Sequence, residues 1–105
     1  MAWVFLSLAA VFEVAFALSM KASKGFTVFW PSVFTAFAIV AGIGLLTMAL
    51  RTLPVSIGYP IWVGAGALGT VLFGHLVFGE VLTPLKIGSV ALIALGVVGL
   101  KLAAN

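Results

Sequence analysis

Seven charged residues divide this 105-residue chain into four long apolar runs. A soluble domain carries about 25 % charged residues, whereas this chain has 7 % and cannot cover a water-facing surface. A membrane-spanning helix needs about 20 apolar residues, and each run is close to that length. The sequence predicts an all-α integral membrane protein, a single domain over residues 1–105, with four spans: Trp3–Met20, Trp30–Leu50, Ser56–Gly79 and Leu85–Leu102. Only short loops remain, so neighbouring helices should run antiparallel.

Composition also excludes several functions. The chain has no cysteine, one histidine and two acidic residues, so we expect no disulfide, no metal site and no bound cofactor. No nucleophile–base pair is available for an enzyme. The net charge of +3 is too sparse for a nucleic-acid surface. The N-terminus lacks the basic stretch and the small-residue cleavage pattern of a signal peptide.

Glu13 is the one charged residue inside the first span. An acidic residue at the centre of a membrane helix costs roughly 2.5 to 3.5 kcal/mol, and such groups usually have a function. The cost falls if the carboxyl group is protonated, faces a wet cavity or meets a cation. The alternative is a buried structural acid that is hydrogen-bonded to a neighbouring helix.

Helical spacing surrounds Glu13 with small and aromatic residues. Residues three and four apart share a helix face, so Tyr59 and Trp62 should lie together on the third span. A carboxylate beside aromatic rings suits an organic cation, because the rings add cation–π attraction of ~0.5 to 2 kcal/mol. We predict a site made by Glu13, Tyr59 and Trp62, and a lining that includes Ala9, Ala10, Phe16, Ala17 and Val63. The alternative for the two rings is an aromatic belt at the membrane surface.

A mechanism follows if a proton and a cation compete for Glu13. A protein that changes its open side only when Glu13 is satisfied would couple proton influx to cation efflux. The proton gradient would then supply the energy.

Three residues outside this site carry expectations of their own. His75 should lie at a helix end or interface, although a proton relay is possible. Glu80 should be solvated or paired with Lys86, unless it joins two subunits. Pro60 should bend the third helix.

The fourth span is nearly bare and carries Gly88, Gly96 and Gly99. Small residues let membrane helices approach closely, which favours dimerisation; packing within the monomer is the alternative. Basic residues are nearly balanced across the membrane, because Arg51 and Lys101 oppose three lysines. Weak orientation preference permits two opposite copies to pair.

Several motifs in this order resemble the small multidrug resistance family over almost the whole length. They are Phe12-Glu13-Val14, Met20-Lys21, Gly25-Phe26-Thr27, Trp30-Pro31-Ser32, Leu53-Pro54, Tyr59 with Ile61-Trp62, Gly64, Gly66, Glu80 and the glycine-rich last helix. The resemblance implies a dual-topology antiparallel homodimer in a bacterial inner membrane. It also implies that protons and organic cations compete for the two membrane glutamates.

The resemblance gives conflicting indications about the substrate. Gly64–Gly69 and Gly99-Leu100-Lys101 are similar to the guanidinium-exporter branch. The pocket departs from that branch, which has tryptophan at Phe16, a small hydroxyl residue at Gly42 and threonine at Val63; Pro60 replaces a usual alanine. A roomier pocket with fewer donors favours quaternary ammonium and other hydrophobic cations.

We therefore expect a broad-specificity exporter of organic cations, with a selective guanidinium exporter as the alternative. Two further hypotheses stay open, namely that the chain is one subunit of a heteromeric pair and that it is a channel. The channel has less support, because no stretch of the chain resembles a selectivity filter.

Overall fold

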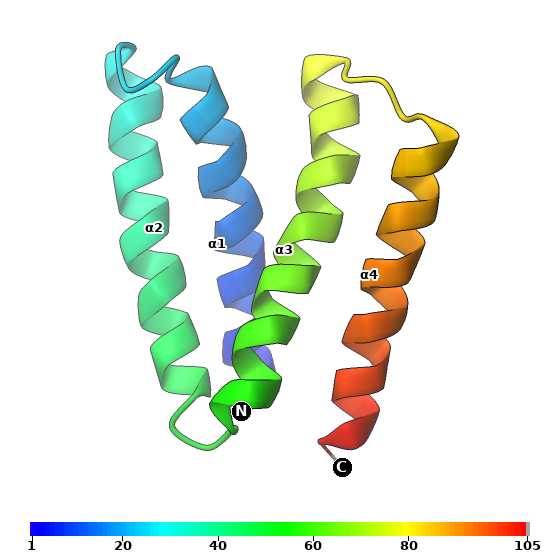
Figure 1. Cartoon of the computed structure of the whole chain (residues 1–105). Coiled ribbons are helices and arrows are strands. Elements are labelled where there is room, and N and C mark those ends of the chain that lie inside the picture. Colours follow the sequence, from blue (N-terminus) through cyan, green and yellow to red (C-terminus); the bar gives the residue numbers. More distant parts are fainter. Residues whose placement is uncertain (105) are drawn as a thin grey trace.

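Four antiparallel helices make up the computed structural model, which describes residues 1–104. They are α1 (Ala2–Ala22), α2 (Phe29–Ala49), α3 (Val55–Phe78) and α4 (Pro84–Ala103). All four are long and apolar enough to cross a membrane. The first and third loops lie at one end of the bundle, and the second loop and both termini lie at the other (Figure 1). The predicted all-α membrane fold is confirmed.

Local sequence signals explain where the helices begin and end. Gly79 ends α3 in the left-handed conformation, with φ of 67°, which glycine adopts without a steric penalty. Pro84 is the first residue of α4, and the Thr83 side chain accepts a hydrogen bond from the Lys86 backbone N–H. Pro60 lies inside α3, and the helix continues on both sides of it.

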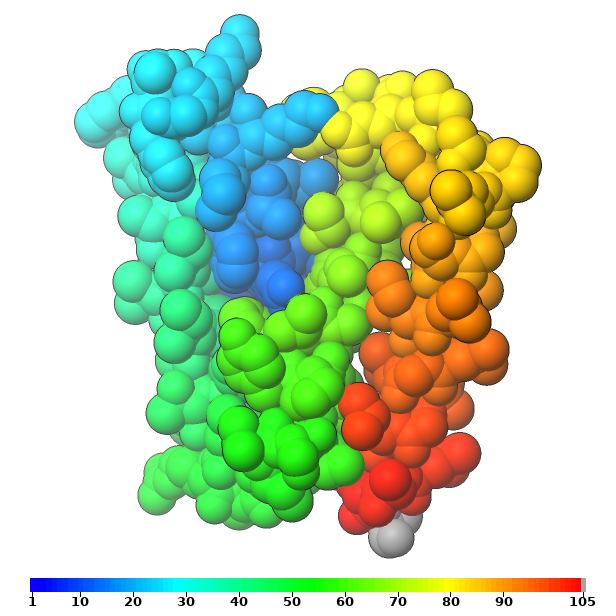
Figure 2. Space-filling model, in the orientation of Figure 1, coloured from blue at the N-terminus to red at the C-terminus, as the bar shows by residue number. Residues whose placement is uncertain are grey.

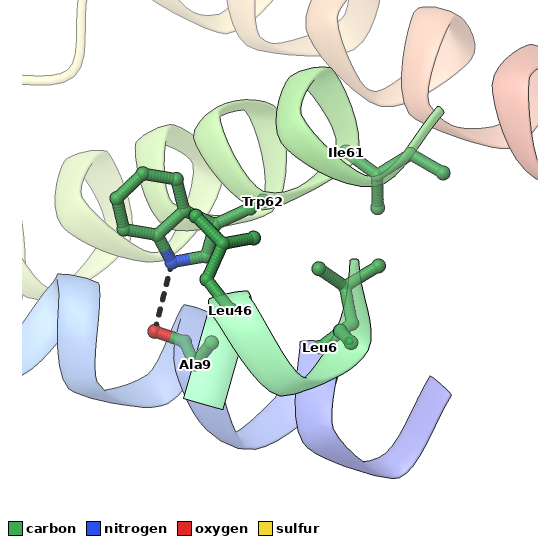
Figure 3. Packing of buried hydrophobic residues seen from close by; sticks show 6 residues of the cluster. Leu6, Ala9, Leu46, Ile61 and Trp62 are labelled. Carbon is green, nitrogen blue, oxygen red and sulfur yellow. Dashed lines mark hydrogen bonds between the residues drawn. The ribbon is translucent and has the colours of Figure 1, made fainter. Parts of the chain in front are cut away.

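The hydrophobic core lies among the first three helices. Its buried members come from α1, α2 and α3, and are Leu6, Ala9, Leu46, Ala49, Ile61 and Trp62 (Figure 3). In contrast, α4 packs against α3 and has no buried residue within Pro84–Ala103. The Lys101 ammonium group lies 4.3 Å from the ring centre of Trp3, which links the C-terminal end of α4 to α1.

The glycines of α4 do not pack within the described chain. A Cβ atom added at Gly88, Gly96 or Gly99 would meet nothing within 4 Å. By contrast, a Cβ atom added at Gly64 in α3 would come within 2.5 Å of Val97. The close contact between α3 and α4 therefore depends on a glycine of α3. Residues 1–104 give the three α4 glycines no packing role inside the monomer.

Glu80 is exposed, as one of the two expectations had it, but it pairs with Lys21 and not with Lys86. The Lys21 ammonium group donates a hydrogen bond to Glu80 and lies 5.0 Å from the ring centre of Phe78. Lys86 instead donates to the Val81 carbonyl oxygen at 2.8 Å. The pairing with Lys86 was expected because Lys86 is close to Glu80 in sequence. The packing of α1 on α3 instead brings Lys21 to Glu80.

This ion pair joins the first loop to the third. The hydrogen bond and charge of Lys21 hold the pKa of the Glu80 carboxyl group below its usual value. A lowered pKa means that the pair is fully present at neutral pH and is lost only when acid protonates Glu80. His75 lies at the same end of α3, where its Nδ1 atom is 2.7 Å from the Glu80 carbonyl oxygen. This places His75 at a helix end.

A hydroxyl pair holds α1 and α2 together near the first loop. Thr35 is completely buried, and its hydroxyl group lies 2.8 Å from Ser19 Oγ of α1 and 2.7 Å from the Pro31 carbonyl oxygen of its own helix. Because little water reaches the space between membrane helices, such a bond has few competing partners. It contributes on average about 0.6 kcal/mol and at most about 1.7 kcal/mol in membrane proteins.

We predict that Thr35→Val lowers the free energy of unfolding by about 0.5 to 1.5 kcal/mol, because the interhelical bond is lost while the side-chain volume is kept. Reversible denaturation in detergent micelles measures the change. Thr47→Val is the matched control, since the exposed Thr47 hydroxyl bonds only to Ile43 O in its own helix. Equal losses in both variants would contradict a role for the interhelical bond.

Candidate functional site

The Glu13 side chain points from the middle of α1 towards α3. It is half-buried, and its Oε2 atom is buried without a hydrogen-bond partner within residues 1–104. A Cβ atom added at Gly66 would overlap the Glu13 carboxyl group. The missing side chain at Gly66 therefore makes the space that the carboxyl group occupies.

Trp62 fixes α3 against α1 one turn before Glu13. Its ring is buried, with 7 % of the residue exposed, and its Nε1 atom donates to the Ala9 carbonyl oxygen at 3.0 Å (Figure 3). An aromatic belt would instead leave the ring at the membrane surface, so that alternative does not describe Trp62. Sequence spacing gave the face of Trp62 but not this bond. The available signal was the small Ala9, four residues before Glu13.

Tyr59 lies beside Trp62 but is more exposed. The two ring centres are 5.6 Å apart in an edge-on arrangement with an angle of 62° between the ring planes. Nearly half of Tyr59 is exposed on the single chain, at 47 %. The structure thus brings the two rings together, as helical spacing predicted, and leaves Tyr59 partly exposed on the surface of the single chain.

The predicted lining residues of α1 are buried or half-buried, whereas the lining residue of α3 is exposed. Ala9 is buried beneath the Trp62 indole, and Ala10 lines a cavity of about 80 Å³ that Trp62 also borders. Phe16 packs against the core cluster, and Ala17 is half-buried. Val63 is exposed on the single chain.

Gly42 packs against the backbone of α1 in the helical turn that ends at Glu13. It is buried in α2, where an added Cβ atom would lie 3.2 Å from Phe12 Cβ and 3.6 Å from Ala9 O. A hydroxyl group at this position would thus begin next to the α1 backbone. Gly66 of α3, by contrast, adjoins the carboxyl group itself.

This arrangement can hold a cation or a proton. A buried carboxylate oxygen without a partner is costly in an apolar environment, and either species would satisfy it. No group of three potential metal-ligating side chains occurs within residues 1–104. The chemistry of the site is therefore that of a single carboxyl group next to Gly66, on the helix that also carries the Tyr59 and Trp62 rings.

Comparison with known proteins identifies the family. Residues 1–93 match the Small Multidrug Resistance protein family. A guanidinium exporter from Proteus vulgaris is 41 % identical over 103 residues, which cover 98 % of this chain and 99 % of that protein. The guanidinium exporters of Escherichia coli K12 and Salmonella typhimurium are 39 % and 40 % identical over the full length of both chains. The chain belongs to the small multidrug resistance family.

Family membership settles the broad class of function. The chain is a transporter, and it is a multi-pass protein of a bacterial inner membrane. The relatives favour the guanidinium alternative over the broad-specificity exporter that the pocket composition suggested. Three pocket residues indicated broad specificity, whereas the similarity to these relatives extends along the whole chain.

We predict that Gly66→Ala lowers the free energy of unfolding by about 1 to 3 kcal/mol, because the added methyl group overlaps the Glu13 carboxyl group. Detergent denaturation measures the loss. Adding Glu13→Ala should relieve the overlap, so the double variant should lose less than the sum of the single losses. Gly44→Ala is the control, because its added Cβ atom meets nothing within 4 Å. Strictly additive losses would contradict the contact.

Proposed function

We propose that this protein exports guanidinium-type cations in exchange for protons, with Glu13 as the shared site. The observation that carries the proposal is the buried Glu13 Oε2 atom, which has no partner within residues 1–104. It occurs in a chain that is about 40 % identical, over its full length, to proteins named guanidinium exporters.

The chemistry of guanidinium fits this carboxyl group. A guanidinium ion is planar and can donate two parallel N–H bonds to one carboxylate, which fixes its orientation as well as its charge. The flat ion can also lie against an aromatic ring. Tyr59 and Trp62 present an edge-on ring pair on the same face of α3 as Gly66, which adjoins the carboxyl group.

Competition at Glu13 supplies the coupling. A proton neutralises the carboxyl group and leaves no charge for the cation, whereas a bound cation leaves no place for the proton. If the protein reorients only in these two satisfied states, an inward proton gradient drives outward movement of the cation. An empty, charged Glu13 would be too costly to carry through the apolar middle of the bundle.

We further propose that the working unit is an antiparallel homodimer. One chain leaves Tyr59 and Val63 exposed, so a second chain is needed to close the site. The surface of α4 carries three glycines with open space before them, which suits close packing of a second helix. The near-balance of basic residues at the two ends permits insertion in both orientations.

A broader range of organic cations is the second candidate. No side chain within residues 1–104 donates a hydrogen bond to Glu13 Oε2. A site with few fixed donors positions the carboxylate less strictly and rejects ions without N–H groups less strongly. This observation favours tolerance of quaternary ammonium ions.

In the proposed dimer, one guanidinium ion would displace a proton from each of the two Glu13 carboxyl groups, and exchange of two protons for one cation moves net charge. We therefore predict that guanidinium evokes a current from the protein in proteoliposomes and that Glu13→Gln abolishes it, because glutamine can neither bind a proton nor pair with the cation. Currents recorded on a supported membrane test this. Glu80→Gln is the matched control, because Glu80 pairs with Lys21 outside the site and should leave the current largely intact. A current that persists in Glu13→Gln would refute the role of Glu13. If the parent protein were silent, it would require a different partner subunit.

We predict that guanidinium gives a larger current than tetraethylammonium at equal concentration, because only guanidinium can donate two hydrogen bonds to Glu13. The same vesicles measure both ions. An equal or larger tetraethylammonium current that is also lost in Glu13→Gln would favour the second candidate.

A further inference from the structure

A cavity of about 490 Å³ lies between α3 and α4, beneath the third loop and apart from Glu13. Its walls are mostly aliphatic and are formed by Val71, Val81, Leu82, Leu85, Val90 and Ile93. Four polar side chains border it, from Glu80, Thr83, Lys86 and Ser89. The α3–α4 cavity therefore combines an apolar interior with a polar border at one end of the bundle. This is the end with the third loop, which is yellow and lies at the top of Figure 2.

Most of the polar border is already engaged in other bonds. Glu80 is paired with Lys21, and Ser89 Oγ donates to Leu85 O at 2.8 Å. Thr83 Oγ1 accepts from the Lys86 backbone N–H at 3.1 Å. The Lys86 ammonium group donates one bond, to Val81 O. An ammonium group has three N–H donors, so two remain for a further partner.

The charges around the cavity disfavour a cation as that partner. Lys21 does not line the cavity, but it pairs with the Glu80 carboxylate, so the Lys86 ammonium group is the one charge of the border that has no ion-pair partner within residues 1–104. An anion therefore complements the border, and an apolar chain complements the walls. In a membrane protein the molecule that carries both parts is an anionic phospholipid, which surrounds the helices at high local concentration.

The position of the cavity agrees with this occupant. Lys86 is in the first turn of α4, a membrane-length helix with no buried residue, and so lies at the level where lipid headgroups meet the hydrocarbon. Basic pockets between membrane helices bind anionic headgroups, and each basic residue near the surface contributes about 1 kcal/mol. The aliphatic walls would replace contacts that the acyl chain makes with other lipids.

We propose that the α3–α4 cavity binds an anionic phospholipid, with the phosphate on the Lys86 ammonium group and part of an acyl chain between α3 and α4. This site is separate from the cation site at Glu13 and does not depend on the exported substrate. A lipid held here would act as a wedge between the two helices below the third loop.

Native mass spectrometry of the purified protein tests the proposal with phosphatidylglycerol and with zwitterionic phosphatidylcholine. The parent protein should retain phosphatidylglycerol preferentially, and Lys86→Gln should weaken that retention about fivefold. Lys24→Gln is the matched control, because Lys24 is an exposed basic residue of the first loop and does not border the cavity. It should retain lipid as the parent does.

A second variant tests the apolar part of the site. Val90→Phe fills the cavity while leaving Lys86 in place, and should also weaken retention. Thermal denaturation in detergent micelles shows whether the variant is folded, and Val90→Leu is the smaller substitution to use if it is not. Equal retention of the two lipids would overturn the proposal. So would equal effects of Lys24→Gln and Lys86→Gln, or a dimer that retains no lipid because a second copy covers the cavity.

Discussion

The close approach of α1 and α3 is the interaction on which the candidate site depends. Gly66 leaves room for the Glu13 carboxyl group, and the Trp62 indole bonds to a backbone carbonyl one helical turn earlier. The first contact sets where the charge lies, and the second sets the separation and rotation of the helices. A membrane bundle gains little from apolar burial against lipid, so close packing and such bonds carry much of the specificity.

The same approach has a consequence at the end of the bundle. It brings Lys21 to Glu80 and so joins the two loops on that side. Lys86 is thereby left to the Val81 carbonyl group, at the border of the α3–α4 cavity. The exported cation and the proposed lipid would thus meet opposite charges at separate places: a carboxyl group between α1 and α3, and an ammonium group between α3 and α4.

Two observations bear on which cation the protein selects, and they favour different answers. The whole-length similarity to guanidinium exporters favours a planar, donor-rich ion. The lack of side-chain donors to Glu13 Oε2 within residues 1–104 favours tolerance of other cations. A single carboxylate attracts any cation, so only the surrounding donors and walls can discriminate among cations. In the proposed dimer, the second chain would add to those walls.

The sequence by itself determined the four spans, their antiparallel order and the isolated charge of Glu13, because apolar runs of this length cross a bilayer as helices that satisfy their own backbone hydrogen bonds. Helical spacing also placed Tyr59 beside Trp62. The tertiary structure alone decided that Trp62 bonds to Ala9, that Gly66 adjoins Glu13 and that Glu80 pairs with Lys21 rather than Lys86. These contacts join residues more than fifty positions apart, and they depend on the rotation and depth of each helix, which the periodicity of one segment does not contain.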